Sequence, residues 1–169
     1  GNAIVGSFTV TDASITTKDI TTSTLSAGTH ALKAQLTDLS GNTGTISSSA
    51  LSVVVDTTAA ASLAAKTPDL KASTDSGTSN TDNNTNDATP DITVDLTSVS
   101  LVVGDIIQIV DTSNGNAIVG SFTVTDASIT TKDITTSTLS AGTHALKAQI
   151  TDLAGNTGTI SSSAVSVVV

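Results

Sequence analysis

The sequence predicts an all-β fold, an antiparallel two-sheet β-sandwich of about seven strands with Greek-key connections. Three observations lead to this prediction. Apolar and polar residues alternate in short runs, as they do in strands that bury one face. Turn-forming residues separate the runs. In addition, no segment keeps the 3.6-residue period of an amphipathic helix, so half-buried antiparallel strands account for the pattern best.

The expected strands follow one another between residues 69 and 169. Alternation assigns a core-facing side in 117–125 and 143–152, consisting of Ile118, Gly120, Phe122 and Val124 in the first stretch and His144, Leu146, Ala148 and Ile150 in the second. Further strands are expected at 69–74, 92–97, 106–110, 129–134 and 159–169. The turn signals between strands are Gly104-Asp105, Ser113-Asn114-Gly115, Ala141-Gly142 and Ala154-Gly155-Asn156.

The core of this fold must be aliphatic. The 169 residues include no Trp, Tyr, Met or Cys, and the aromatic residues are Phe8 and Phe122. Ile, Val, Leu and Ala must therefore fill the interior, without any disulfide. We expect marginal stability, because burial must offset a large loss of conformational entropy.

The charge is carried by short acidic side chains. All 15 acidic residues are Asp, all six basic residues are Lys, and the formal net charge is −9. Asp favours turns and the coordination of hard cations, but acidity also keeps an extracellular protein soluble, so charge alone leaves both interpretations open. The balance argues against a nucleic-acid partner, which needs clustered Lys and Arg. No apolar run approaches the roughly 20 residues of a spanning helix, so we expect no membrane insertion.

The chain repeats itself. Residues 1–55 return as residues 115–169 with three differences, Leu36/Ile150, Ser40/Ala154 and Leu51/Val165. A period of 114 residues corresponds to a whole domain, because solenoid repeats run about 20–50 residues. We therefore predict the C-terminal half of one repeat at 1–55, an inter-repeat linker at 56–68 and a complete repeat at 69–169, from a tandem array of nearly identical neighbours.

The half repeat 1–55 is expected to need completion. It carries the later strands of a sandwich without the first three, and exposed strand edges are templates for pairing. Residues 56–114 could pair with it, but the connection would be strained, so their pairing with 115–169 should prevail. We expect a neighbouring molecule or an unusual arrangement to complete residues 1–55.

The order of motifs resembles a known family. The stretches TSNTDNNTNDATPDITV, SAGTHALKAQITDLAGNTG and SVVVDTTAA are similar to the immunoglobulin-like repeats of large bacterial adhesins, the RTX and biofilm-associated class. The similarity covers 69–169 and again 1–55. It implies an immunoglobulin-like sandwich that binds Ca²⁺, lies outside the cell on its surface, and serves as a spacer between identical neighbours.

The candidate metal site is the acidic stretch 74–91, which holds four Asp and four Asn. Ca²⁺ takes roughly six to eight oxygens from carboxylates, amides and carbonyls, and this stretch offers them, although the order of residues is not that of an EF-hand. Composition alone favours an ordinary mobile loop; the resemblance favours the ion. The candidate ligands are Asp75, Asp82, Asn83 and Asp87 in this loop, Asp152 and Asn156 after a later strand, Asp38 in the first copy, and Asp56 in the linker.

Sandwich topology predicts where these residues lie. The loop 74–91 should lie at the end where the chain leaves the sandwich, and the loop with Asp152 and Asn156 at the end where the chain enters. A cation held by the first loop of one repeat, Asp56 and the last loop of the next repeat would stiffen the junction.

Other chemistry is not expected. His144 and its copy His30 fit a corner side chain bonded to local backbone better than a catalytic role, because no catalytic partner is evident. Ser161, Ser162 and Ser163 lack the strand-turn-helix context of a nucleophile elbow. We predict no enzyme activity. The alternative to a spacer is an adhesive module that binds carbohydrate, protein or ice, but recognition usually needs exposed aromatic or Arg side chains.

Overall fold

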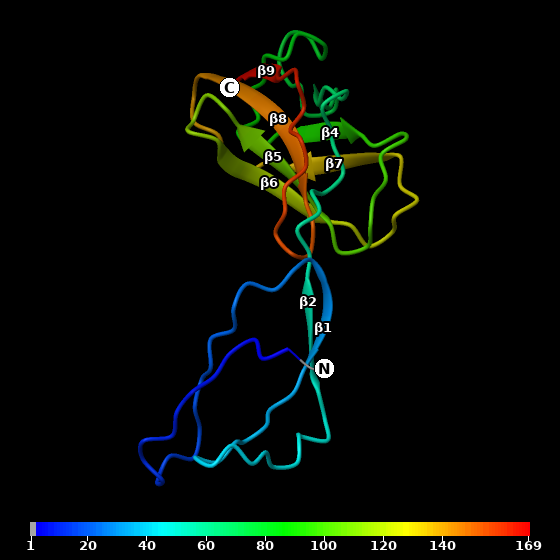
Figure 1. Cartoon of the computed structure of the whole chain (residues 1–169). Helices are drawn as coiled ribbons and strands as arrows, with labels where there is room; N and C mark the ends of the chain where they lie inside the picture. The colour runs from blue at the N-terminus through cyan, green and yellow to red at the C-terminus, as the bar shows by residue number, and fades with distance from the viewer. Residues whose placement is uncertain (1–2) are drawn as a thin grey trace. The chain divides into compact units, whose positions relative to one another are not determined.

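The computed structural model describes residues 3–169, which form two compact units, one up to residue 57 (unit 1) and one of residues 58–169 (unit 2) (Figure 1). The first two residues of the predicted half repeat lie outside the described residues. Across residues 3–169 every regular element is a strand, so the all-β prediction is confirmed. None of the described segments is a helix of the length and apolar character needed to cross a membrane.

Unit 2 is a two-sheet antiparallel sandwich. Its strands are β3 (Asp69–Leu70), β4 (Asp91–Asp95), β5 (Ile106–Asp111), β6 (Ala117–Thr123), β7 (Thr131–Thr135), β8 (Thr143–Thr151) and β9 (Val165–Val168). One sheet has the order β3-β4-β7 and the other the order β6-β5-β8-β9. The β4–β7 and β5–β8 pairs join strands that are distant in sequence, as Greek-key connections require. The predicted sandwich of about seven strands is confirmed.

An aliphatic core fills the space between the two sheets. β8 follows the predicted alternation, since Leu146, Ala148 and Ile150 are fully buried and the intervening residues are partly exposed. The largest fully buried aliphatic side chains are Leu63, Ile92, Leu96, Ile107, Ile109, Leu146 and Ile150. Phe122 is only partly buried at the margin of this core, with the Lys132 ammonium 3.9 Å from its ring centroid. The interior therefore rests on branched side chains, as composition predicts.

A β-bulge decides which residues of β6 face the core. The β5–β6 pairing passes from Ile109↔Gly120 to Val110↔Ile118, so Val119 is the extra residue. Val119 is buried, whereas Ile118, which alternation assigned to the core, is 55% exposed. The prediction for Ile118 is wrong because an inserted residue shifts the alternation by one position.

Two strands are shorter than predicted because local hydrogen bonds replace the ladder. β3 ends at Leu70, since the amides of Thr74 and Asp75 both donate to the Lys71 carbonyl (2.8 and 3.0 Å) and turn the chain. Before β9, the Ala148 amide donates to the Ser161 hydroxyl (3.1 Å). A side-chain oxygen thus stands in for a backbone acceptor, and regular pairing begins only at residue 165.

The segment before β3 packs on the sandwich. Leu63 is fully buried, and its amide donates to the Thr159 carbonyl (2.9 Å). The Lys66 ammonium lies 2.9 Å from the Asp95 carboxylate, and this hydrogen bond is the main reason that the pKa of Asp95 is lowered to about 2. Much of the stretch 56–68, expected as a linker, therefore contributes contacts to unit 2.

The described residues of unit 1 form one two-stranded sheet. β1 (Gly28–Leu32) pairs with β2 (Leu51–Val55) in the register of β8 and β9, with Thr29↔Val54 matching Thr143↔Val168. Residues 3–9 and 17–21, which are equivalent to β6 and β7, form no strand. Their partners in unit 2 are β5 and β4, which have no counterpart within residues 3–57.

Leu146→Ala should lower the free energy of unfolding of unit 2 by about 2–5 kcal/mol, because a fully buried side chain leaves a cavity. The matched Leu32→Ala changes a half-buried residue of β1 and should cost less than about 1 kcal/mol. Urea unfolding followed by circular dichroism measures both. Equal losses would contradict a core confined to unit 2.

Candidate functional site

The loop between β3 and β4 is ordered by polar side chains. Thr85 is buried, and its hydroxyl donates to the Thr74 carbonyl (2.6 Å). The same oxygen accepts hydrogen bonds from the amides of Ser76 (3.2 Å) and Asp87 (3.0 Å). The Ser76 hydroxyl in turn donates to the side-chain oxygen of Asn86 (2.6 Å). These bonds fix the path of the loop, so it differs from a free tether.

Asp75 is a buried carboxylate inside this loop. Its Oδ2 accepts a hydrogen bond from the Asn83 amide (3.1 Å), and Asn83 has a φ of 59°. Its Oδ1 is buried and has no hydrogen-bond partner among the described residues. Leaving a buried polar atom unsatisfied costs about 1–3 kcal/mol, and more for a charged group. A cation bound at Oδ1 would remove that cost, so Asp75 has the chemistry of a metal ligand.

Asp82 and Asp87 do not join Asp75. Each closes its own turn, since the Asp82 carboxylate accepts from the Asn84 amide (3.1 Å) and the Asp87 carboxylate from the Thr89 amide (2.8 Å). Within residues 3–169, no three acidic or histidine side chains gather into a group that could hold a metal ion. An ion in this loop would therefore depend on Asp75 together with neutral amide, hydroxyl and carbonyl oxygens.

Asp152 and Asn156 lie together in the turn after β8. The Asp152 carboxylate accepts from the amides of Ala154 and Asn156 (both 2.9 Å) and from the Asn156 side chain (3.0 Å). The Asn156 side-chain hydrogen bond is the main cause of the lowered pKa of Asp152. In unit 1, Asp38 accepts from the backbone and side-chain amides of Asn42 (both 2.8 Å). Local sequence builds this turn, because it forms in both copies.

The two predicted loops lie at opposite ends of unit 2 (Figure 1). The Thr85 amide donates to the Val168 carbonyl (2.9 Å), so the β3–β4 loop lies where the chain leaves the sandwich. The loop after β8 lies against the incoming segment, where Leu63 bonds to Thr159. The predicted positions of the two loops are confirmed. Asp56 directly follows β2 in unit 1, and its meeting with the loops of neighbouring repeats stays a prediction.

A buried ion pair that the sequence analysis missed lies at the start of β8. His144 Nε2 is 2.9 Å from the Ser140 carbonyl oxygen, which confirms the predicted bond to local backbone. Its Nδ1 is 2.6 Å from a carboxylate oxygen of Asp111, at the end of β5. Because both ring nitrogens face acceptors, only the protonated ring can donate to both, so this arrangement favours the cationic form of His144.

The pKa of His144 is raised and that of Asp111 is lowered, so both shifts favour the charged forms of the pair. The hydrogen bond to Asp111 is the main cause of the raised pKa of His144. Burial raises the pKa of Asp111, but hydrogen bonds from Ser113 and His144 outweigh it, and the net pKa lies below the usual value. The pair is therefore structural: it joins β8 to β5, and neither ring nitrogen of His144 is left for catalysis.

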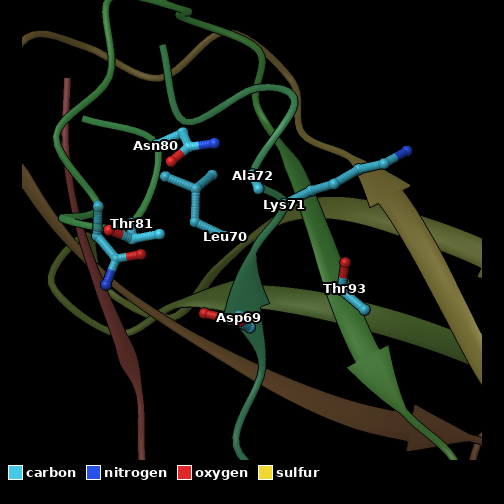
Figure 2. Close-up of a pocket in the computed structure, with 8 residues that line it drawn as sticks. Asp69, Leu70, Lys71, Ala72, Asn80, Thr81 and Thr93 are labelled. Carbon is cyan, nitrogen blue, oxygen red and sulfur yellow. The ribbon is translucent and has the colours of Figure 1, made fainter. Parts of the chain in front are cut away.

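A hollow of about 290 Å³ lies beside β3 (Figure 2). Asn80 and Thr81 of the loop stand beside Leu70, and Lys71 extends from the end of the strand. The Lys71 ammonium is held by the Asp133 carboxylate at 2.8 Å. The residues that line the hollow include no aromatic or Arg side chain. It therefore lacks the anchors on which recognition usually depends.

The strand order and the antiparallel pairing define unit 2 as an immunoglobulin-like β-sandwich. The family model described as bacterial Ig-like domain matches residues 62–169, more than half of the chain. The chain therefore belongs to the bacterial Ig-like domain family. None of the curated proteins matches it. Domains of this family are typically non-catalytic modules, commonly found as repeats on bacterial surface proteins.

Replacing His144 by Gln should destabilise unit 2 by about 3–5 kcal/mol near pH 5.5, because the Asp111 carboxylate would lose its buried cationic partner. The raised pKa means that the stabilisation by His144 is complete below about pH 6.5 and is lost as pH rises through the folded-state value. The difference between wild type and variant should therefore shrink by pH 8.5. Denaturant titrations at the two pH values measure it.

His30→Gln is the matched control for this pair. His30 makes the equivalent bond to the Ser26 carbonyl (2.8 Å), but unit 1 has no counterpart of Asp111 within its described residues. We expect only a small loss of stability, because no buried carboxylate loses its partner. A His144→Gln cost that is the same at both pH values would contradict the ion pair.

Proposed function

We propose that the chain is part of the extender region of a bacterial surface adhesin of the RTX or biofilm-associated class, where tandem repeats act as extracellular spacers. The main observation that supports this proposal is the path of the chain through unit 2. The incoming segment lies against the loop after β8, whereas Val168 pairs with Thr143 at the other end of that strand. The chain thus enters and leaves at opposite ends of β8.

This path makes repetition add length. β8 has nine residues, so its ends are about 30 Å apart at roughly 3.3 Å per residue. Each repeat joined in this way would add its own length to an array. The near-identity of residues 1–55 and 115–169 supports the same role, because a spacer needs many equivalent units and no unit-specific surface. The adhesive alternative receives no comparable support from the lining of the hollow beside β3.

Calcium is proposed as the ion that stiffens the spacer. The buried Oδ1 of Asp75 supports a cation in the β3–β4 loop, and Ca²⁺ accepts the mixed set of carboxylate, amide and carbonyl oxygens that the loop offers. Asp82, Asn83 and Asp87 are the other proposed contributors there. At each junction, a linker Asp such as Asp56 would act with the first loop of the preceding repeat and the last loop of the next. Asp152 and Asn156 are the proposed contributors from that last loop, and Asp38 is the equivalent residue in the first copy. Ions at both ends would restrict hinge motion between identical neighbours.

Calcium should raise the melting temperature of unit 2. At 100 times its dissociation constant, a ligand that binds only the folded state adds about 2.7 kcal/mol to the free energy of unfolding. Asp75→Asn should abolish this rise, and Mg²⁺ should cause little, since it prefers a tight octahedral shell. Differential scanning calorimetry with Ca²⁺, Mg²⁺ and chelator measures the shift.

Asp126→Asn is the control for the calorimetry, because Asp126 closes an exposed turn with Ser128 between β6 and β7, outside the β3–β4 loop. It should leave the calcium-dependent rise intact. A rise of equal size in Asp75→Asn would refute the role of the β3–β4 loop.

Two complete repeats in tandem should be longer and stiffer in calcium. Small-angle scattering in Ca²⁺ should give a larger radius of gyration and a narrower distribution of sizes than scattering with chelator, because ions at the junction would limit bending. Curves that overlay under the two conditions would count against stiffening by the ion, although the spacer path through each repeat would stand.

A further inference from the structure

Asn114 and Gly115 are the one Asn-Gly pair in the sequence. They lie in the turn between β5 and β6, where residues 112–116 are all exposed. Asn is chemically labile in proteins, because the main-chain nitrogen of the next residue can attack its side-chain carbonyl and close a five-membered ring. In a folded chain, this reaction requires that the attacking nitrogen and the side chain are both free to meet.

The hydrogen bonds of the turn leave the Gly115 nitrogen free. The Ala117 amide donates to the Asn114 carbonyl (3.0 Å), and the two residues between them have φ values of 60° and 62°. These left-handed values and the closing bond define a type I′ turn, in which the fourth amide donates and the second does not. Accordingly, the Gly115 amide donates to no acceptor among the described residues.

The Asn114 side chain is also free to take part. It is exposed and makes no hydrogen bond to the described residues. Asn156 shows the opposite arrangement, since its side-chain nitrogen donates to the Asp152 carboxylate (3.0 Å). The side-chain oxygen of Asn86 likewise accepts from the Ser76 hydroxyl (2.6 Å). Rotation of the Asn114 amide toward the next nitrogen breaks no such contact.

The residue that follows each Asn singles out position 114. The sequence has eight other Asn residues, of which four precede Thr and the rest precede Asn, Asp or Ala. A side chain on the following residue crowds its own nitrogen, and the β-branched side chain of Thr crowds it most. Gly has no Cβ, so the nitrogen of Gly115 can approach the Asn114 side chain without this hindrance.

We propose that Asn114 is a site of spontaneous covalent modification in the folded protein, which converts it to Asp and isoaspartate. The Gly115 nitrogen forms a bond to the side-chain carbonyl carbon of Asn114. The bond from that carbon to the side-chain nitrogen breaks, and this nitrogen leaves as ammonia with the proton from the Gly115 amide. Solvent water then opens the cyclic imide at either of its carbonyls, so no enzyme, oxidant or reductant is needed.

The modification would change one end of unit 2. Both products place a new carboxylate on the turn, which is held to β8 because the Thr112 amide donates to the Ala145 carbonyl (2.9 Å). Isoaspartate also lengthens the main chain by one carbon, which would move the carbonyl of residue 114 away from the Ala117 amide. That bond closes the turn beside the last pair of the β5–β6 ladder, Asp111↔Ala117. The inference rests neither on calcium nor on the spacer function.

Incubation of the full chain in warm, mildly alkaline water enriched in oxygen-18 tests this proposal. Peptide mapping by mass spectrometry locates each modified Asn, and electron-transfer fragmentation distinguishes isoaspartate from Asp. We expect both products at Asn114, each with one oxygen-18 atom, at a rate at least tenfold above that of any other Asn in the chain. A circular dichroism spectrum recorded during the incubation checks that the chain stays folded.

Asn114→Gln is the matched variant, because its longer side chain would have to close a six-membered ring, which forms much more slowly. It keeps an uncharged amide on the exposed turn, and a melting temperature of unit 2 equal to that of the wild type checks its folding. We expect no accumulation of isoaspartate at position 114 in this variant.

Four results would overturn the proposal. An intact Asn114 in the folded chain, with modification of the same residue in urea, would mean that the turn protects it. Equal rates at several Asn residues would remove the selectivity. Isoaspartate at the wild-type level in Asn114→Gln would place the reaction elsewhere. Asp without isoaspartate would mean direct hydrolysis of the side chain and not ring closure.

Discussion

The sandwich depends on the two ladders of β5, which pairs with β6 on one side and β8 on the other. The chain contains the test of this dependence, because the sequences of β6 and β8 recur in unit 1 without a β5. Among the described residues of unit 1, only the part of the β8 sequence that pairs with β9 in unit 2 forms a strand, β1. Alternating sequence is thus a condition for these strands, but a partner edge and a covered face are what make them form.

The fold was predictable to the extent that it follows from local pattern. β8 alternates strictly, and its buried face is the predicted one. β6 looked equally regular, but the bulge at Val119 turned Ile118 outward, and nothing in the local sequence marks the extra residue. The Asp111–His144 pair could not be predicted from the sequence for a similar reason. Residues 33 positions apart meet only because β5 and β8 are neighbours, a fact of topology and not of motif.

In the candidate site too, some features follow from local sequence and others depend on the folded topology. The turn of Asp152 and Asn156 forms in both copies from residues four positions apart, so its geometry belongs to the local sequence. The acidic loop was predicted as a group of equivalent ligands, yet its carboxylates differ. The carboxylates of Asp82 and Asp87 accept hydrogen bonds from amides two residues ahead. Asp75 is instead buried, and its carboxylate accepts from the more distant Asn83 amide. Burial of one Asp among several depends on how the whole loop folds back, which composition does not encode.

The attachment of β9 has a mechanical consequence. β9 is antiparallel to β8, and the Thr85 amide and the Asn83 carbonyl both bond to Val168 at its far end. Tension on the C-terminus would draw β9 along its own axis, across hydrogen bonds that run perpendicular to it. Such a load shears these bonds together instead of peeling them one at a time. A fibre made of such modules would resist flow through the hydrogen bonds of its last strand, which also carries the buried core residues Val165 and Val167.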